Sequence, residues 1–359
     1  MLYGHGGDIY GLARRLGKRP EEVIDFSSNI SPLPPPPGLR EVLIRHIDEI
    51  SRLPEVDSLG LREAIGRRYG IGPDRIFVVP GTTDWIHTIP GLLRPERVVI
   101  PIPTYADYED AARKAGCEVV TVPIGPEGFS IRECLDAIFH AARERDLVFL
   151  CNPNNPTGRF IPPHDIADAA SKRPQTFWVV DESYAPFVAE DALSSLLGCS
   201  LENILILRSF SKIYGVPGLR LGYAVCSQAM KETLGQAMKP WAVGRLSQIA
   251  GEYLLKETAY EEEVRKYCTQ EKRRLLALLE GVSFLKPLPA EAHFILFQVH
   301  YPWSAGKVTK FLEAGGILIR DCSNFSGLDG RYIRMALRSR KENDMLAHVL
   351  RRMDSDKDF

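Results

Sequence analysis

The sequence has no excess of charge of either sign. Its 359 residues include 45 Lys and Arg against 46 Asp and Glu, a formal net charge of −1. Proteins that hold nucleic acid through bulk electrostatics carry an excess of positive charge, so this class is disfavoured. We expect no nucleic-acid partner.

Cysteine is scarce, and its spacing is irregular. The seven Cys are an odd number, and no two form a Cys-x-x-Cys pair. This disfavours a disulfide framework and a four-Cys zinc site, and it favours reduced thiols in a cytoplasmic enzyme. The eight His include no His-x-x-x-His pair, so we expect no metal site.

Long apolar runs are also missing. No run approaches the roughly 18 residues that a membrane-spanning helix needs, and Met1 to Tyr10 contain no apolar segment typical of a signal peptide. We therefore expect a cytoplasmic protein with no membrane partner.

Short apolar runs alternate with segments of helical periodicity from about residue 58 onward. This alternation predicts an α/β domain with one mainly parallel sheet of seven strands. The expected strands are Ile76–Val79, Val98–Pro101, Glu118–Val122, Leu147–Cys151, Phe177–Val180, Ile204–Leu207 and Gly222–Cys226. The expected helices are Leu61–Tyr69, Asp107–Ala115, Ile131–Arg143 and Ala229–Met238.

The C-terminal third has a different pattern, which predicts a smaller α+β domain. One long amphipathic helix is expected over Arg245–Glu280. The other expected elements are strands over His293–Val299, Ile317–Arg320 and Arg331–Leu337 and a helix over Glu342–Arg352. We expect the loop-rich first 45 residues to pack against this part. Residues 46–244 would then form the large domain, and 1–45 with 245–359 the small one.

Polar clusters directly follow five of the predicted strands. They are Gly81–Asp84, Pro103–Tyr105, Asn152–Gly158, Asp181–Tyr184 and Ser209–Lys212. Each has an ordinary explanation as a turn, a helix cap or a solvated surface residue. Together they indicate one ligand, because ligands of open parallel sheets bind at the carboxyl ends of the strands.

Pyridoxal 5′-phosphate is the ligand whose chemistry needs all five clusters. It requires a lysine for its aldehyde, a carboxylate near its pyridine nitrogen, donors to its ring oxygen, and amides, hydroxyls and an arginine for its phosphate. The sequence offers Lys212, Asp181, Asn155 with Tyr184, and Gly81–Thr83 with Ser209 and Arg220.

These motifs resemble those of the fold-type I pyridoxal-phosphate enzymes of the class I and II aminotransferase family. Asn155-Pro-Thr-Gly158, Asp181-x-x-Tyr184, Ser209-x-Ser-Lys212 and Arg220 match that family in order and spacing. The resemblance implies that Lys212, Asp181 and Tyr184 are catalytic and that Arg334 binds a carboxylate. The implied cofactor-binding residues are Gly81, Thr82, Thr83, Tyr105 stacked on the ring, Asn155, Asp181, Tyr184, Ser209, Ser211, Lys212 and Arg220.

Further segments, most of them near the two ends of the sequence, indicate a particular branch of this family. Five segments are similar to L-threonine-O-3-phosphate decarboxylases of cobalamin synthesis, close relatives of the histidinol-phosphate aminotransferases: His5–Tyr10, Asp25–Leu33, Pro103–Tyr108, Arg320–Leu328 and Ile333–Arg338. This implies decarboxylation of L-threonine O-3-phosphate to (R)-1-amino-2-propanol O-2-phosphate and carbon dioxide. Amino transfer stays open, because the catalytic motif serves both reactions. The candidate substrate-binding residues are His5, Ser28, Asn29, Asn155, Arg320, Arg334 and Arg338.

Two segments depart from the family pattern. The family commonly has a Tyr-Pro pair whose Tyr reaches the cofactor phosphate of the neighbouring subunit in a homodimer, and here the pair is Leu53-Pro54. The phosphate loop, commonly Gly-Asn-Gly or similar, has the sequence Gly81-Thr82-Thr83-Asp84. The resemblance still implies a homodimer, with phosphate binding altered in detail.

Overall fold

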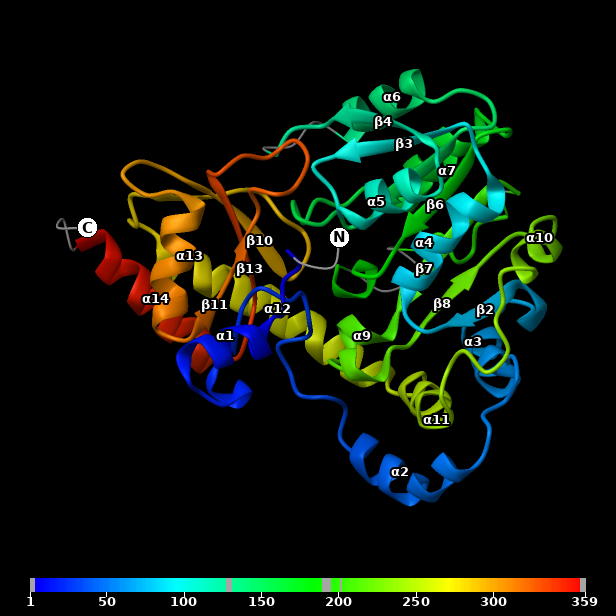
Figure 1. Ribbon diagram of the computed structural model, residues 1–359, viewed down its shortest axis with the longest axis horizontal. Coiled ribbons are helices and arrows are strands. Elements are labelled where there is room, and N and C mark those ends of the chain that lie inside the picture. Colours follow the sequence, from blue (N-terminus) through cyan, green and yellow to red (C-terminus); the bar gives the residue numbers. More distant parts are fainter. Residues whose placement is uncertain (1–3, 127–130, 189–194, 201, 356–359) are drawn as a thin grey trace.

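A computed structural model describes residues 4–126, 131–188, 195–200 and 202–355. Its centre is a seven-stranded sheet in the order β2-β8-β7-β6-β5-β3-β4, in which β8 alone runs antiparallel to its neighbours (Figure 1). The strands are β2 (Ile76–Val79), β3 (Arg97–Ile102), β4 (Glu118–Pro123), β5 (Leu147–Cys151), β6 (Phe177–Asp181), β7 (Ile204–Ser209) and β8 (Gly222–Val225). The predicted α/β class and the mainly parallel sheet are confirmed.

Helices follow most of these strands and cover them. Every residue of β2, β5 and β8 is buried, which is why these strands are continuous apolar runs rather than alternating ones. The helices of this part are α3 (Leu59–Tyr69), α4 (Thr82–Leu93), α5 (Asp107–Lys114), α6 (Ile131–Ala141), α7 (Pro163–Ser171), α9 (Phe210–Ile213) and α10 (Lys231–Gly235). The sheet therefore presents the carboxyl ends of its parallel strands as one edge.

The two ends of the chain meet beside this sheet. Strand β1 (Ile24–Asp25) pairs in parallel with β11 (Ile317–Leu318), and Figure 1 shows the blue helix α1 (Ile9–Leu16) among the orange and red C-terminal elements. An antiparallel sheet of order β12-β13-β10-β9 lies in the same region. Its strands are β9 (Leu285–Pro287), β10 (Phe294–Val299), β12 (Arg320–Asp321) and β13 (Tyr332–Ala336), accompanied by α13 (Ala305–Ala314) and α14 (Arg340–Ser355). We propose that these elements form the small domain.

The expected single helix over Arg245–Glu280 is wrong. The chain forms α11 (Arg245–Leu254) and α12 (Thr258–Leu279), separated by a bend. Because of the bend, the two helices pack against different neighbours. Helix α11 contacts α3 and α2 (Leu39–Arg45), whereas α12 contacts α14. Apolar spacing continues through the bend, so periodicity alone does not detect it.

Two other predicted boundaries also differ. The strand expected over Ile317–Arg320 is divided between β11 and β12, which belong to different sheets. The helix expected over Ala229–Met238 shortens to Lys231–Gly235. In both places a partner strand or a turn interrupts a pattern that is regular in sequence.

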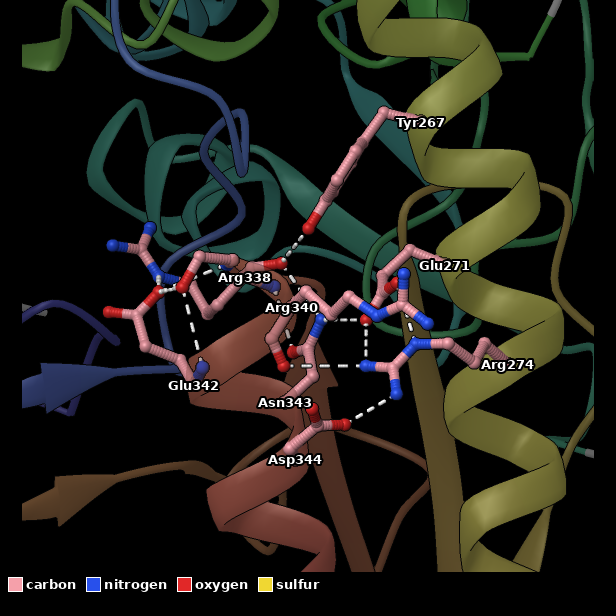
Figure 2. A network of polar contacts seen from close by, with 9 residues as sticks. Tyr267, Glu271, Arg274, Arg338, Arg340, Glu342, Asn343 and Asp344 are labelled. Carbon is pink, nitrogen blue, oxygen red and sulfur yellow. Dashed lines mark hydrogen bonds and ion pairs between the residues drawn. The ribbon is translucent and has the colours of Figure 1, made fainter.

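A buried polar network joins α12 to α14 (Figure 2). The fully buried Asn343 accepts a hydrogen bond from the Arg338 amide at 3.0 Å and donates to Glu271 Oε1 at 2.9 Å and to the Arg338 carbonyl at 2.8 Å. Glu271 also pairs with Arg274. All the hydrogen-bonding groups of the Asn343 amide are thereby used inside the protein, which is the condition under which a buried amide is tolerated.

No helix within the described parts of the chain combines the length and apolar character needed to cross a bilayer.

Replacing Asn343 with Ala should lower the free energy of unfolding by about 2–4 kcal/mol, because buried partners on both helices lose their hydrogen bonds. Urea unfolding followed by circular dichroism measures this loss. Asp344→Ala, one residue along the same helix, removes only an exposed ion pair with Arg274 and should change stability by less than about 1 kcal/mol. Equal losses in the two variants would contradict the assigned role of Asn343.

Candidate active site

The polar clusters at the strand ends surround a cavity of about 520 Å³. It lies where β5, β6 and β7 end, beside the start of α4. All eleven predicted cofactor-binding residues line it, together with Tyr108, Cys151 and Ser183. Segments that are far apart in sequence therefore converge on one space, which we call the cofactor cavity.

Lys212 is a partly buried amine in the wall of this cavity. It lies on α9, a single helical turn directly after β7, with its Nζ 5.9 Å from the centre of the Tyr184 ring. Burial, assisted by the cations of Arg334 and Arg220 and opposed by Asp181, lowers the pKa of Lys212 to about 8. A lysine with this pKa has a much larger neutral, nucleophilic fraction near physiological pH than an unperturbed lysine.

Asp181 is the buried carboxylate at the end of β6. Its Oδ2 accepts a hydrogen bond from Tyr108 at 2.9 Å, and its Oδ1 accepts bonds from the Ser183 hydroxyl at 2.6 Å and amide at 3.0 Å. Burial raises the pKa of Asp181, while these donors and Lys212 favour its charged form. The bonds also fix the orientation of the carboxylate.

The start of α4 and Arg220 form the anion-binding end of the cavity. Gly81 precedes α4 with a φ of 85°, and a Cβ there would lie 2.6 Å from Arg220 Nη2, so a larger residue would collide with the guanidinium. The amides of this helix start, the hydroxyls of Thr82, Thr83 and Ser209, and Arg220 are a suitable donor set for a phosphate. Asp84, the acidic departure in this loop, lies 3.0 Å from Lys239 and is paired with it.

These groups fit pyridoxal 5′-phosphate. A partly buried amine, a fixed carboxylate and an anion-binding end line one cavity, in the arrangement that the aldehyde, the pyridine nitrogen and the phosphate of the cofactor require. Asn155 and Tyr184, on the same wall, would donate to the ring oxygen. Burial keeps Tyr184 protonated by raising its pKa.

A second cavity, of about 690 Å³, adjoins the first and shares Tyr105, Asn155, Tyr184 and Lys212 with it. Six of the seven predicted substrate-binding residues line it: His5, Ser28, Asn29, Asn155, Arg320 and Arg334. We call it the substrate cavity. Its other lining residues come from the N-terminal segment, from the turn after β12 and, with Ala106, from the loop before α5.

Arg334 and Arg320 bring two separate cations to the substrate cavity. The buried Arg334 on β13 donates to Asn155 Oδ1 and to the Ser27 carbonyl, and its Nε has no hydrogen-bond partner among the described residues. Arg320 on β12 is more accessible. It donates to Asn324 Oδ1 at 2.6 Å and lies 4.8 Å from the centre of the Phe325 ring.

The N-terminal segment closes one side of the substrate cavity. Asp25 accepts hydrogen bonds from the hydroxyls of Ser27 and Ser28, at 2.6 and 2.5 Å. Asn29 donates to the Tyr184 hydroxyl at 3.4 Å. This segment therefore connects the substrate cavity to a residue of the cofactor cavity.

Arg338 lies outside both cavities, in contrast to the prediction. It follows the end of β13, and its side chain lies 3.9 Å from Glu342 while its backbone joins the network of Figure 2. The strand ends at Ala336, so the alternation that directs Arg334 to the cavity no longer applies to Arg338.

Sequence reasoning did not find Tyr108, Ser183, Asn324 and Phe325 as site residues. Ser183 lies within the recognised Asp181–Tyr184 motif, and Asn324 and Phe325 lie within the recognised Arg320–Leu328 segment. Tyr108 lies within the recognised Pro103–Tyr108 segment, but no role was predicted for it. Its hydrogen bond to Asp181 depends on how α5 packs beneath the cavity.

Comparisons with known proteins agree with this geometry. Residues 21–352 match the family described as aminotransferase class I and II. The chain is 34% identical to a threonine-phosphate decarboxylase of Salmonella typhimurium, over 97% of this chain and 95% of that protein. It is 32% identical to a histidinol-phosphate aminotransferase of Archaeoglobus fulgidus, over 92% and 93%. It superimposes on the crystal structure of L-threonine-O-3-phosphate decarboxylase from Porphyromonas gingivalis with a TM-score of 0.84 and 28% identity, over 93% of this chain and all of that one.

Pyridoxal 5′-phosphate is the cofactor of the matched family, and Lys212 should react with its aldehyde in a pH-dependent way. The neutral amine is the reactive form, so the rate for the cofactor-free protein should rise with pH and level off above about pH 8. Stopped-flow absorbance measures this rate. An unperturbed lysine would give a rate that rises until about pH 10.4.

Two variants serve as controls for this reaction. Lys212→Ala should abolish it. Arg334→Gln removes a buried cation that lowers the Lys212 pKa, so the rate should level off at higher pH. A profile that continues to rise to about pH 10 in the unaltered protein would contradict the assigned environment of Lys212.

Proposed function

We propose that this chain, which belongs to the aminotransferase class I and II family, decarboxylates L-threonine O-3-phosphate. Membership makes it a pyridoxal-phosphate enzyme. The proposed products are (R)-1-amino-2-propanol O-2-phosphate and carbon dioxide, and the proposed setting is cobalamin synthesis. Support comes from the similarity to proteins named as decarboxylases of this substrate and from the substrate cavity itself.

The observation that carries the proposal is the pair of separate cations in the substrate cavity. L-Threonine O-3-phosphate has two anionic groups, a carboxylate and a phosphate, whereas histidinol phosphate has only the phosphate. Arg334, buried close to Lys212, suits the carboxylate, and the more accessible Arg320 with Asn324 suits the phosphate. One substrate thereby satisfies both arginines at once.

The bound cofactor accepts the electrons of the bond that breaks at the substrate Cα. The protein selects which bond that is by orienting the substrate, and Arg334 with Asn155 would hold the carboxylate for this purpose. When the bond between Cα and the carboxylate breaks, carbon dioxide leaves and Cα takes up a proton. Lys212, with a pKa of about 8, is the group placed to deliver it.

Amino transfer is the alternative, because histidinol-phosphate aminotransferases are about as similar to this chain. In that reaction the Cα–H bond breaks, and Lys212 would act as base at the same carbon. The alternative requires a second substrate, a 2-oxoacid, to accept the amino group. This requirement separates the two reactions experimentally.

Incubation of the cofactor-loaded protein with L-threonine O-3-phosphate should release carbon dioxide with no 2-oxoacid present. Isotopic capture of carbon dioxide measures it. Arg320→Gln should lower kcat/KM about 10- to 100-fold through loss of a charged phosphate contact. Turnover of histidinol phosphate that depends on 2-oxoglutarate, with no carbon dioxide from threonine phosphate, would establish the alternative.

We also propose that the protein is a homodimer, as members of this family typically are. An apolar strip runs over Ile44, Ile47, Ile50, Leu53 and Val56, all exposed, with Leu53 at 73%. Exposed apolar strips of this kind mark interaction surfaces. Leu53, which stands where the family commonly has a Tyr, thus belongs to this apolar strip and makes no polar contact to a phosphate.

An adjoining groove extends the strip toward the cofactor cavity. It is lined by residues 35–41 and 215–219, and the second of these segments immediately precedes Arg220. A partner bound at this surface would lie close to the anion-binding end of the cofactor cavity.

Replacing Ile50 and Leu53 together with Asp should convert the dimer to a monomer, because two charges would be buried in an apolar interface. Sedimentation velocity measures the mass. Tyr301→Asp is the matched control, since Tyr301 is 95% exposed and lies outside the strip. A monomeric unaltered protein, or a dimer that survives both charges, would contradict this assignment.

A further inference from the structure

A buried carboxylate lies between two imidazoles beside the active site. Asp107, the first residue of α5, is 4% exposed. Its Oδ1 lies 3.5 Å from His5 Nε2, and its Oδ2 lies 3.7 Å from His87 Nε2. Asp107 Oδ2 also accepts a hydrogen bond from the Tyr105 hydroxyl at 2.8 Å. We call these four residues the Asp107 cluster.

The cluster brings together three parts of the site that the sequence separates. His5 lies on the N-terminal segment and lines the substrate cavity, and Tyr105 lines both cavities. His87 lies on α4, the helix that begins at the anion-binding end of the cofactor cavity. Asp107 is not a lining residue of either cavity, so it acts through its neighbours.

The Asp107 carboxylate has few hydrogen bonds for so buried a group. Its Oδ1 has no hydrogen-bond partner among the described residues, and neither has His87 Nδ1. The side chain therefore does not cap α5 through Oδ1, and the residue at the helix start, Ala106, provides no side-chain cap. A buried carboxylate is costly unless cations compensate its charge, and the two imidazoles are the groups placed to do so.

Burial and the adjacent Asp107 raise the pKa of Tyr105 far above its usual value, so its hydroxyl remains a donor at physiological pH. The bond to Asp107 therefore fixes the Tyr105 ring, whose centre is 6.1 Å from that of His5. A fixed ring and a fixed imidazole are then neighbours in the wall of the substrate cavity.

We propose that Asp107 is a positioning residue that holds Tyr105 in place and directs His5 at the substrate cavity, where His5 supplements Arg320 in binding a dianionic group. His87 contacts the other oxygen of the Asp107 carboxylate and, like His5, helps to compensate its charge. This inference rests on the proposed function only for the identity of the dianion, the substrate phosphate.

Sulfate is a suitable probe, because its double negative charge does not change with pH in the relevant range. In the cofactor-loaded protein the first anion site is filled by the cofactor phosphate, so calorimetric titration with sulfate reports the substrate cavity. Asp107→Asn retains an acceptor for Tyr105 and removes the charge. It should weaken sulfate binding about tenfold, as should His5→Gln.

A double-mutant cycle distinguishes positioning from general damage. Because Asp107 acts through His5, the Asp107→Asn and His5→Gln variant should bind sulfate no more weakly than either single variant. Asp110→Asn, on the same helix but outside both cavities, is the matched control and should bind sulfate like the unaltered protein. Arg320→Gln should weaken sulfate binding further in every background.

Unchanged sulfate binding in a folded Asp107→Asn variant, or multiplicative losses in the double variant, would overturn the inference. Tyr105→Phe keeps the ring, removes the donor and tests the same link if Asp107→Asn does not fold. It should weaken sulfate binding only when His5 is present, and an equal loss without His5 would overturn the inference. The double-mutant cycle can give the expected result even if threonine phosphate releases no carbon dioxide. In that case the role of Asp107 stands and only the proposed substrate is wrong.

Discussion

The site depends on the cost of removing the charge of Lys212 from water. A buried ammonium is unfavourable, and the cations of Arg334 and Arg220 make it more so, which leaves the amine reactive near neutral pH. The carboxylate of Asp181 limits this effect from the other side of the cavity. The seven-stranded sheet holds the carboxylate at the end of β6 and the amine directly after β7, and Arg220 lies at the anion-binding end of the same cavity. Strand β13 brings the buried Arg334 to them.

Much of the seven-stranded sheet follows from sequence because its signals are local. Apolar runs predict the seven strands, and the polar residues directly after them predict the positions of Asp181, Asn155 and Lys212. The order of parallel strands then places these residues at one edge. The small domain is less predictable, because whether Ile317–Leu318 and Arg320–Asp321 form one strand or two depends on which partner strand lies beside them.

The parts of the site that sequence reasoning did not find are contacts between elements. Tyr108 reaches Asp181 only because α5 packs against α4, β3 and β4, and its ring stacks on Phe149 with their centres 4.9 Å apart. The two imidazoles near Asp107 come from positions 5 and 87, and no spacing rule connects them. Arg338 is the opposite case. Its place in a segment similar to the family predicted a role in substrate binding, but the residue lies beyond the end of β13 and outside both cavities.

The pairing of the two chain ends has a consequence for synthesis on the ribosome. The cofactor cavity is built from residues 81–220, all of which emerge before the last third of the chain. The substrate cavity needs Arg334 to meet Ser27, and β1 to meet β11, so it can form only after almost the whole chain is made. Closing so long a loop costs only slightly more entropy than closing a shorter one. A nascent chain can thus gain its cofactor-binding part before its substrate-binding part, and truncation near the C-terminus would leave a protein that has the first part and lacks the second.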